Sequence, residues 1–272
     1  MSLVSTDWLL ENLDSVKIID SSWHLPNQNR NAQEEYSNKH IINSVFFDID
    51  KHSNQETDLP HMLPSVRRWE DIVSNLGISN RDKIIIYDNS DLISSCRCWY
   101  TFIYFGHNPS LVSVLNGGLK KWIEERKPTV NFETTLNKTF YKANENKKMV
   151  KSKVEIDENI TSKNFKVIDA RSLERFEGKV PEPRKNIRGG SISGSSCLPF
   201  NKLINKNNNT FKNDEELEQI FKQIINTKDN NIVFSCGSGV TASVLALAYS
   251  LINTKYIPTI YDGSWSEYGL IK

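Results

Sequence analysis

A cysteine followed by two glycines is the feature of this sequence with the clearest potential for chemistry. Cys236 ends the apolar run Ile232–Ser235, and Gly237 and Gly239 follow it closely. Glycines let the backbone curl so that successive N–H groups point at one atom. Such a cradle, closed by a helix N-terminus, favours a negatively charged sulfur, and a thiolate is a nucleophile. The alternative is a buried structural cysteine at a strand end, although such a residue does not require two glycines.

The residues around the cysteine predict the elements that hold it. Asn231 to Ser235 carries β-branched and aromatic residues suited to a buried strand, and Thr241 to Leu251 is a helical run that is apolar nearly all round. Cys236 is therefore expected at the carboxyl end of a strand. In open α/β sheets this edge is where ligands bind.

Four segments of the first half recur in the second half, in the same order and at an offset of roughly 150 residues. This repetition predicts an α/β protein of two tandem domains, each a mainly parallel sheet flanked by helices. We expect a non-catalytic domain at 1–130, a solvated linker at 131–153 and a catalytic domain at 154–272. The first domain is expected to be non-catalytic because Asp88 stands where the second has Cys236, and a carboxylate cannot accept and pass on sulfur. The paired segments are Val16–Asp20 with Phe165–Asp169, His40–Phe47 with Ser191–Leu198, Ile84–Asp88 with Ile232–Cys236, and Leu115–Trp122 with Tyr261–Tyr268.

Composition limits the classes of partner. The 272 residues include 34 basic and 33 acidic ones, which gives a net charge of +1. This charge is too small to attract nucleic acid or an anionic membrane as the principal partner. No basic region followed by an apolar core begins the sequence, and no apolar stretch approaches the length of a membrane span. We therefore expect a soluble, cytoplasmic protein.

The four cysteines are too few and too unevenly placed for a disulfide framework, which fits a reducing compartment. Cys96 and Cys98 have no second pair of ligands at metal-binding spacing and are interpreted as packing residues of a helix. We expect neither a metal ion nor a cofactor.

Several motifs together resemble the 3-mercaptopyruvate sulfurtransferases of the rhodanese superfamily, over nearly the whole chain. The cysteine loop Cys236–Ala242 is the most specific of them. The others are Phe46–Asp50, His61–Pro64, Arg97 with Trp99, Asn116–Gly118, Asp169–Arg171, Arg175–Phe176, Pro181–Arg184 and Asp262–Trp265.

The resemblance implies that Cys236 takes sulfur from 3-mercaptopyruvate as a persulfide and leaves pyruvate. The N–H groups of Gly237, Gly239, Val240 and Thr241 would share the charge of the persulfide. A thiol acceptor, such as thioredoxin or a small thiol, or else cyanide, would then remove the outer sulfur.

The resemblance also places Arg175 and Arg184 on the substrate carboxylate and ketone. Arginine suits this role because its planar fork donates two parallel hydrogen bonds to a carboxylate. The alternative is that both side chains are merely exposed, as most arginines are.

A proton relay is the remaining implication of the resemblance. In the family, a histidine and an aspartate from the first domain meet a serine of the loop, and here His61, Asp50 and Ser238 occupy those positions. A carboxylate can orient the imidazole and favour its protonated form. His61 could equally be a hydrogen-bond partner at a domain interface.

Three other functions fit the sequence less well. A thiosulfate sulfurtransferase binds a compact dianion and typically has cations beside its cysteine, whereas Gly237 and Ser238 are neutral. A cysteine-dependent phosphatase needs an arginine six residues after the cysteine, where this chain has Ala242. A non-catalytic rhodanese-like binding module would usually lack the cysteine.

Overall fold

The computed structural model describes residues 2–226 and 231–271, and contacts divide them into two compact units. The first unit contains the chain up to Gln55, together with Leu63–Asn146 and Lys206–Thr210. The second contains Glu56–Met62, Lys147–Asn205 and the chain from Phe211 onward. Two short segments therefore leave the unit of their sequence neighbours: Glu56–Met62 groups with the second unit, and Lys206–Thr210 groups with the first.

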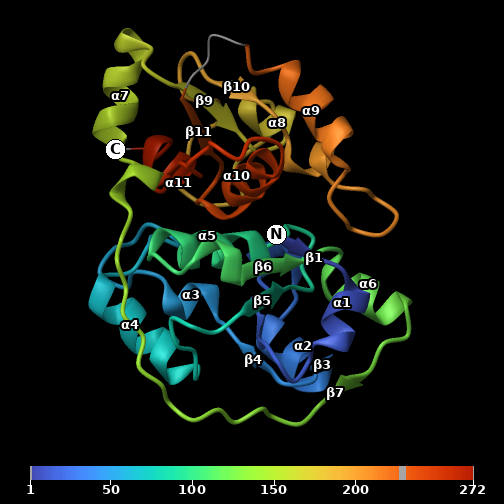
Figure 1. Cartoon of the computed structure of the whole chain (residues 1–272). Helices are drawn as coiled ribbons and strands as arrows, with labels where there is room; N and C mark the ends of the chain where they lie inside the picture. Colours follow the sequence, from blue (N-terminus) through green and yellow to red (C-terminus); the bar gives the residue numbers. More distant parts are fainter. Residues whose placement is uncertain (1, 227–230, 272) are drawn as a thin grey trace. The chain divides into compact units, whose positions relative to one another are not determined.

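The first unit alternates short strands with helices, drawn from blue to green in Figure 1. The first helix begins after Ser5, whose side chain accepts a hydrogen bond from the N–H of Trp8. The elements are β1 (Leu3–Val4), α1 (Thr6–Glu11), β2 (Lys17–Asp20), η1 (Pro26–Gln28), α2 (Ala32–Asn38), β3 (His40–Ile41), β4 (Ser44–Phe46), α3 (Ile49–His52), α4 (Val66–Asn75), β5 (Ile84–Tyr87), α5 (Ser95–Tyr104), η2 (Pro109–Leu111), β6 (Val112–Leu115), α6 (Gly118–Glu124) and β7 (Thr129–Val130).

The second unit repeats this alternation, in yellow to red in Figure 1. The elements are η3 (Lys147–Met149), β8 (Val150–Lys151), α7 (Lys153–Ser162), β9 (Lys166–Asp169), α8 (Leu173–Phe176), β10 (Ser196–Cys197), η4 (Phe200–Leu203), α9 (Asp214–Lys222), β11 (Ile232–Ser235), α10 (Val240–Ile252), β12 (Ile260–Tyr261) and α11 (Ser264–Tyr268).

The two main sheets have the same topology. The first has the order β1-β6-β5-β2-β4, and the second, read in the same direction, has the order β8-β12-β11-β9-β10. Every pair in both sheets is parallel. The small β3–β7 pair is antiparallel. The predicted duplication of a parallel α/β fold is confirmed, and β11 occupies in its sheet the place that β5 occupies in the first.

Both faces of each sheet are covered by helices, because successive strand residues point to opposite sides. On one face of the second sheet, Val167 and Val233 pack with Trp265 of α11. On the other face, Phe234 contacts Phe221 of α9 and Tyr249 of α10, with ring centroids 6.2 and 6.1 Å apart. The first sheet has a corresponding core of Ile18, Ile85 and their neighbours with Trp122 of α6. Strands buried on both faces hold the loops at their ends in fixed positions.

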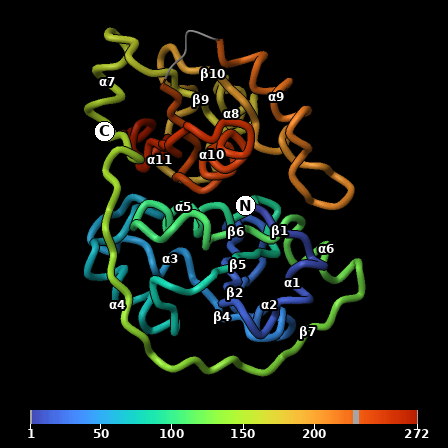
Figure 2. The backbone as a smooth tube through the Cα atoms, in the orientation of Figure 1, coloured from blue at the N-terminus to red at the C-terminus, as the bar shows by residue number. Residues whose placement is uncertain are grey.

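The segment after β7 differs from the solvated linker that composition predicted. Residues 131–146 have no regular structure, and Figure 2 shows them running along the outside of the first unit. Tyr141 is nevertheless only 1% exposed, and its ring stacks on His107 at 5.8 Å. Thr139 donates to the Ile78 carbonyl at 2.6 Å. Polar composition concealed these anchors because one buried aromatic side chain is enough to fix an otherwise hydrophilic segment.

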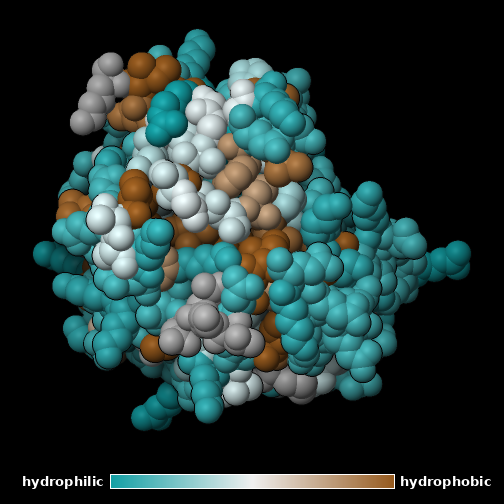
Figure 3. All heavy atoms as spheres, turned by 90° about the horizontal axis from the view of Figure 1, so that it is seen from above, coloured by the Kyte–Doolittle hydropathy of each residue, from teal (hydrophilic) through white to brown (hydrophobic). Residues whose placement is uncertain are grey.

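Polar side chains predominate on the face of the molecule in Figure 3, where apolar residues form small separate groups. None of the described helices combines the length and apolar character that crossing a membrane requires.

Candidate active site

Cys236 lies at the carboxyl edge of the second sheet. It directly follows β11, which pairs with β9 on one side and with β12 on the other. Only 2% of Cys236 is exposed. The predicted strand and helix on either side of it are confirmed, since β11 ends at Ser235 and α10 begins at Val240.

The loop after Cys236 is anchored through its carbonyl groups. The N–H of Trp265 donates to the Cys236 carbonyl at 2.9 Å, and the N–H of Ser266 donates to the Gly237 carbonyl at 2.8 Å. The Ser266 hydroxyl donates to the same Gly237 carbonyl at 2.6 Å. Helix α11 therefore anchors the loop through its carbonyl groups, a contact that nothing in the sequence predicted beyond the resemblance of Asp262–Trp265 to a family motif.

The N–H groups of the loop lead into the N-terminus of α10. Gly239 precedes this helix with a φ of 80°, a conformation that glycine adopts without strain. Val240 and Thr241 are the first two residues of α10. Among the described residues, the N–H groups from Gly237 to Val240 have no hydrogen-bond acceptor. Unpaired N–H groups at a helix N-terminus favour a negative charge nearby.

The corresponding loop of the first unit already holds a carboxylate. Asp88 follows β5 as Cys236 follows β11. Its Oδ2 accepts from the N–H of Ser90 at 3.1 Å, from the Ser90 hydroxyl at 2.7 Å and from the N–H of Ser94 at 3.2 Å. This loop is thus an internal example of the same strand-end position surrounding an anion with N–H donors.

Arg175 and Arg184 both approach the Cys236 loop at Gly237. A Cβ atom added to Gly237 would lie 3.3 Å from Nη2 of Arg175 and 3.6 Å from Nη1 of Arg184. Arg175 is carried by α8, where its N–H donates to the capping Ser172 hydroxyl at 3.4 Å. The absence of a side chain at Gly237 leaves room for both guanidinium groups beside the loop.

A buried carboxylate that sequence reasoning did not single out connects the arginines. Glu182 Oε1 accepts from Nη1 of Arg171 at 2.8 Å, and Glu182 Oε2 accepts from Nη2 of Arg175 at 2.5 Å. Arg171 also donates to both oxygens of Asp169, and its guanidinium lies 4.5 Å above the Trp265 ring. Burial alone would lower the pKa of Arg171, but the hydrogen bonds with Asp169 and the charges of Asp169 and Glu182 raise it. The position of Glu182 within the motif Pro181–Arg184 was the only sequence signal.

Ser238 connects two of the predicted site residues. Its Oγ lies 2.8 Å from Nδ1 of His61 and accepts from Nη2 of Arg184 at 3.3 Å. His61 and Ser238 are buried, with exposures of 3% and 4%. Although His61 is distant in sequence, its segment Glu56–Met62 groups with the second unit.

Asp50, the third residue of the predicted relay, belongs to α3 of the first unit. Its Oδ2 accepts from the indole N–H of Trp23 at 2.9 Å. Its backbone carbonyl accepts from the Gln55 side chain at 2.8 Å. The predicted link from Asp50 to His61 stays a prediction.

Comparison with protein-family models identifies this architecture. The model described as "Rhodanese-like domain" matches residues 5–125 and again residues 152–270. The chain belongs to the rhodanese family. The predicted family and its tandem arrangement are confirmed.

Named rhodanese relatives cover nearly the whole chain. The 3-mercaptopyruvate sulfurtransferase of Mus musculus is 36% identical over 98% of this chain and 91% of its own length. The thiosulfate sulfurtransferase of Rattus norvegicus is also 36% identical, with the same two coverages. Among solved structures, SseA from Escherichia coli, described as a 3-mercaptopyruvate sulfotransferase, matches with a TM-score of 0.87 at 33% identity, covering 97% of this chain and 99% of that one. These relatives are named for sulfur transfer, as the sequence analysis predicted for this rhodanese.

The other three cysteines of this rhodanese chain are less suited to act as nucleophiles. Cys96 and Cys98 are fully buried in α5, as predicted for packing residues, and burial raises the pKa of each well above its usual range. Burial also raises the pKa of Cys197 to about 12. A thiol that stays protonated is a poor sulfur nucleophile. All four cysteines are free, and no group of three or more His, Cys, Asp or Glu side chains in the described ranges could hold a metal ion.

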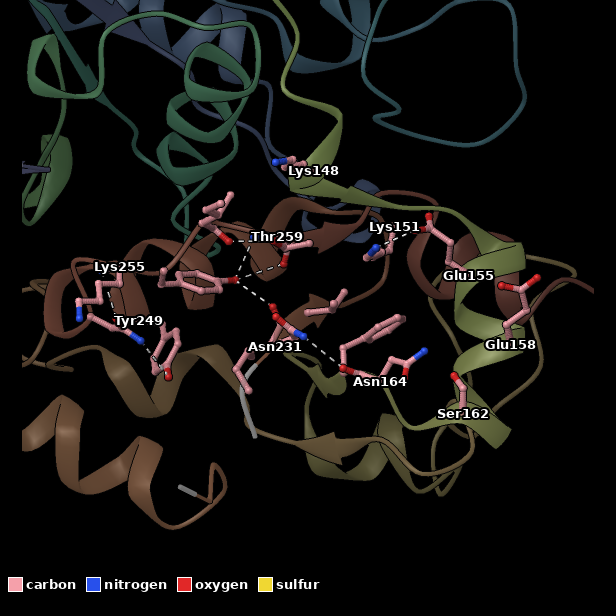
Figure 4. Close-up of a pocket in the computed structure, with 16 residues that line it drawn as sticks. Lys148, Lys151, Glu155, Glu158, Ser162, Asn164, Asn231, Tyr249, Lys255 and Thr259 are labelled. Carbon is pink, nitrogen blue, oxygen red and sulfur yellow. Dashed lines mark hydrogen bonds and ion pairs between the residues drawn. The ribbon is translucent and has the colours of Figure 1, made fainter. Parts of the chain in front are cut away.

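A cavity of about 580 Å³ in the second rhodanese domain lies away from this chemistry (Figure 4). It opens where Phe165 and Asn231 precede β9 and β11, at the amino ends of the strands. Its polar groups bond to one another, as Asn231 does to the Asn164 carbonyl and Lys151 to Glu155. None of the predicted site residues lines it.

Proposed function

We propose that this rhodanese transfers sulfur from 3-mercaptopyruvate to a thiol through a persulfide on Cys236, releasing pyruvate. The observation that supports this most strongly is the meeting of Cys236, its unpaired loop N–H groups and two guanidinium groups at Gly237. The loop N–H groups suit a sulfur anion on Cys236, and the two guanidinium groups suit the carboxylate of a keto acid.

The reaction requires no oxidant or reductant. The Cys236 thiolate attacks the substrate sulfur, a sulfur–sulfur bond forms, and the carbon–sulfur bond breaks with its electrons passing to the enolate of pyruvate. The proton of the substrate thiol is transferred to the enolate carbon, so that pyruvate and an ionised persulfide result. A thiolate acceptor then attacks the outer sulfur and restores the Cys236 thiolate.

Ser238 is the group best placed to carry that proton. Its hydroxyl contacts both His61 and Arg184, so a proton can pass between the hydroxyl and the imidazole. Asp50 would orient His61 from the first domain, as the resemblance implies. Arg184 fixes the hydroxyl while its Nη1 lies beside Gly237, where the substrate carboxylate would bind.

We further propose that the first domain, residues 1–130, serves as a scaffold joined by residues 131–153 to a catalytic domain at 154–272. The Asp88 carboxylate supports this assignment because it occupies the anion position of its own loop and cannot carry sulfur.

Thiosulfate is the alternative sulfur donor, since relatives named for thiosulfate are as similar as those named for 3-mercaptopyruvate. The neutral Gly237 and Ser238 next to the cysteine favour the keto acid, because a compact dianion would be held best by cations at those positions.

For the acceptor, we propose a small thiol or a thioredoxin-like protein in the cytoplasm. Four free cysteines support a reducing compartment. One plant relative is named as mitochondrial, so cell fractionation with compartment markers is the appropriate test.

Steady-state kinetics with 3-mercaptopyruvate and thiosulfate measured side by side test the donor. We expect a higher kcat/KM for 3-mercaptopyruvate, and an equal or higher value for thiosulfate would contradict the proposal. Cys236→Ser should lose turnover, and mass spectrometry should place one added sulfur on the Cys236 peptide of the donor-treated wild type only. Arg184→Ala should raise KM for 3-mercaptopyruvate well beyond its effect on thiosulfate.

A further inference from the structure

The Glu182 carboxylate is buried between two guanidinium groups that belong to different parts of the site. Its side chain is only 3% exposed. It accepts from Nε and Nη2 of Arg175 at 3.2 and 2.5 Å, which is a two-pronged contact. It also forms an ion pair with Arg171 at 2.8 Å. Glu182 therefore determines where the Arg175 guanidinium lies and how much of its charge is already balanced.

The charges beside the Cys236 loop nearly cancel. Three guanidinium groups, those of Arg171, Arg175 and Arg184, face two carboxylates, those of Asp169 and Glu182. Apart from the Cys236 thiolate, whose charge the loop N–H groups would share, these five side chains leave one net positive charge. The side chains of Arg171, Asp169 and Glu182 are at most 3% exposed, so bulk water screens them weakly.

We propose that Glu182 is a specificity-determining residue that selects sulfur donors with a single negative charge. A residual charge of +1 matches one carboxylate, as in a 3-mercapto-2-keto acid with a protonated thiol. Attraction to the residual +1 doubles for a dianion such as thiosulfate, but the cost of removing the dianion from water rises roughly fourfold, with the square of its charge, so one net positive charge cannot compensate it. This inference rests on the proposed transfer of sulfur from a keto acid at the same site, and it adds the physical reason for the choice of donor.

Replacing Glu182 with an uncharged isostere tests this choice. In Glu182→Gln, the ratio of kcat/KM for thiosulfate to kcat/KM for 3-mercaptopyruvate should rise by about tenfold or more, because the local charge becomes +2 in a weakly screened site. A purely structural role would lower both values together and leave their ratio unchanged. Glu177→Gln is the matched control, since Glu177 lies nearby in sequence and pairs with the exposed Lys179. Its ratio should stay within about twofold of the wild type.

A second pair of variants keeps the test decisive if Glu182→Gln does not fold. Arg171→Gln lowers the local charge to zero without touching the arginines assigned to the substrate, and the double variant Arg171→Gln with Glu182→Gln restores +1 while removing both partners of the buried Arg171–Glu182 pair. The ratio should fall in the single variant and return toward the wild-type value in the double variant. The inference is wrong if removing Glu182 leaves the ratio unchanged in either background. A wild type that prefers thiosulfate would instead contradict the proposed donor, and the shift caused by Glu182 could still be measured.

Discussion

Asp20 is predicted to make the stability of the first unit depend on pH. It ends β2 and is only 1% exposed, and its Oδ1 accepts from the N–H of Ser22 at 2.9 Å and from the Ser22 hydroxyl at 2.5 Å. Burial raises the pKa of Asp20 to about 7 from an ordinary 3.8, although the Ser22 hydrogen bonds oppose this. The shift of about three pH units corresponds to about 4 kcal/mol.

The sign follows from proton binding. Between pH 3.8 and about 7, the folded state keeps the Asp20 proton that the unfolded state has released. The free energy of unfolding therefore falls as pH rises through this window, and the full cost is present above about pH 7. Asparagine has a similar shape and no charge to desolvate, so Asp20→Asn should be more stable than the wild type at pH 8 by up to about 4 kcal/mol, with the difference disappearing near pH 4.

Urea unfolding at several pH values, followed by tryptophan fluorescence, measures this difference. Five of the six tryptophans lie in the first unit, so fluorescence reports mainly on it. Asp169→Asn is the matched control, because Asp169 ends β9 at the equivalent position but binds the Arg171 guanidinium. That variant should lose about 3 kcal/mol at pH 8 in the unfolding of the second unit, followed by far-ultraviolet circular dichroism, since a buried guanidinium loses a partner.

The reasoning about Asp20 would be refuted by a stability difference between wild type and Asp20→Asn that does not change from pH 5 to pH 8. It would also be refuted if the wild type became more stable relative to the variant as pH rises.

Two further substitutions test the assignments made to the two loops. Ser238→Ala should lower kcat by about 100-fold with 3-mercaptopyruvate, because the hydroxyl between His61 and Arg184 is lost. Ser250→Ala in α10 is its control, and a Ser238→Ala enzyme within twofold of the wild type would rule out the relay. Asp88→Ala should lower the free energy of unfolding by about 2–3 kcal/mol, because the donors of Ser90 and Ser94 lose a buried acceptor. Its kcat/KM should match the wild-type value, and a folded but inactive variant would show that the first loop takes part in catalysis.

Local patterns were sufficient to predict the elements around the cysteine. Apolar runs on either side of the two glycines predicted a strand before Cys236 and a helix after it. The ends of β11 and α10 match the predicted ends to within one residue. The internal repeat predicted two parallel sheets of one topology. These features are readable because hydrophobic period and glycine position act over a few residues.

Contacts between distant residues could not be predicted in this way. The approach of Arg175 and Arg184 to Gly237 depends on how the turn around Pro181 folds back toward the loop. His61 reaches Ser238 across 177 positions of sequence. Family resemblance supplied these residues, but their distances and partners, including Glu182, came only from the folded chain.

Asp20 and Asp169 show which features follow from the sequence and which follow only from the tertiary structure. The sequence by itself determined that each ends a short buried strand, since Lys17–Asp20 and Lys166–Asp169 share the pattern of lysine, two apolar residues and aspartate. Only the tertiary structure decided that one carboxylate meets a serine and the other a buried arginine that Glu182 also holds. The physical reason is that hydrophobic pattern sets the strand locally, whereas the free energy of a buried charge depends on solvent exclusion and on partners brought in by the rest of the fold.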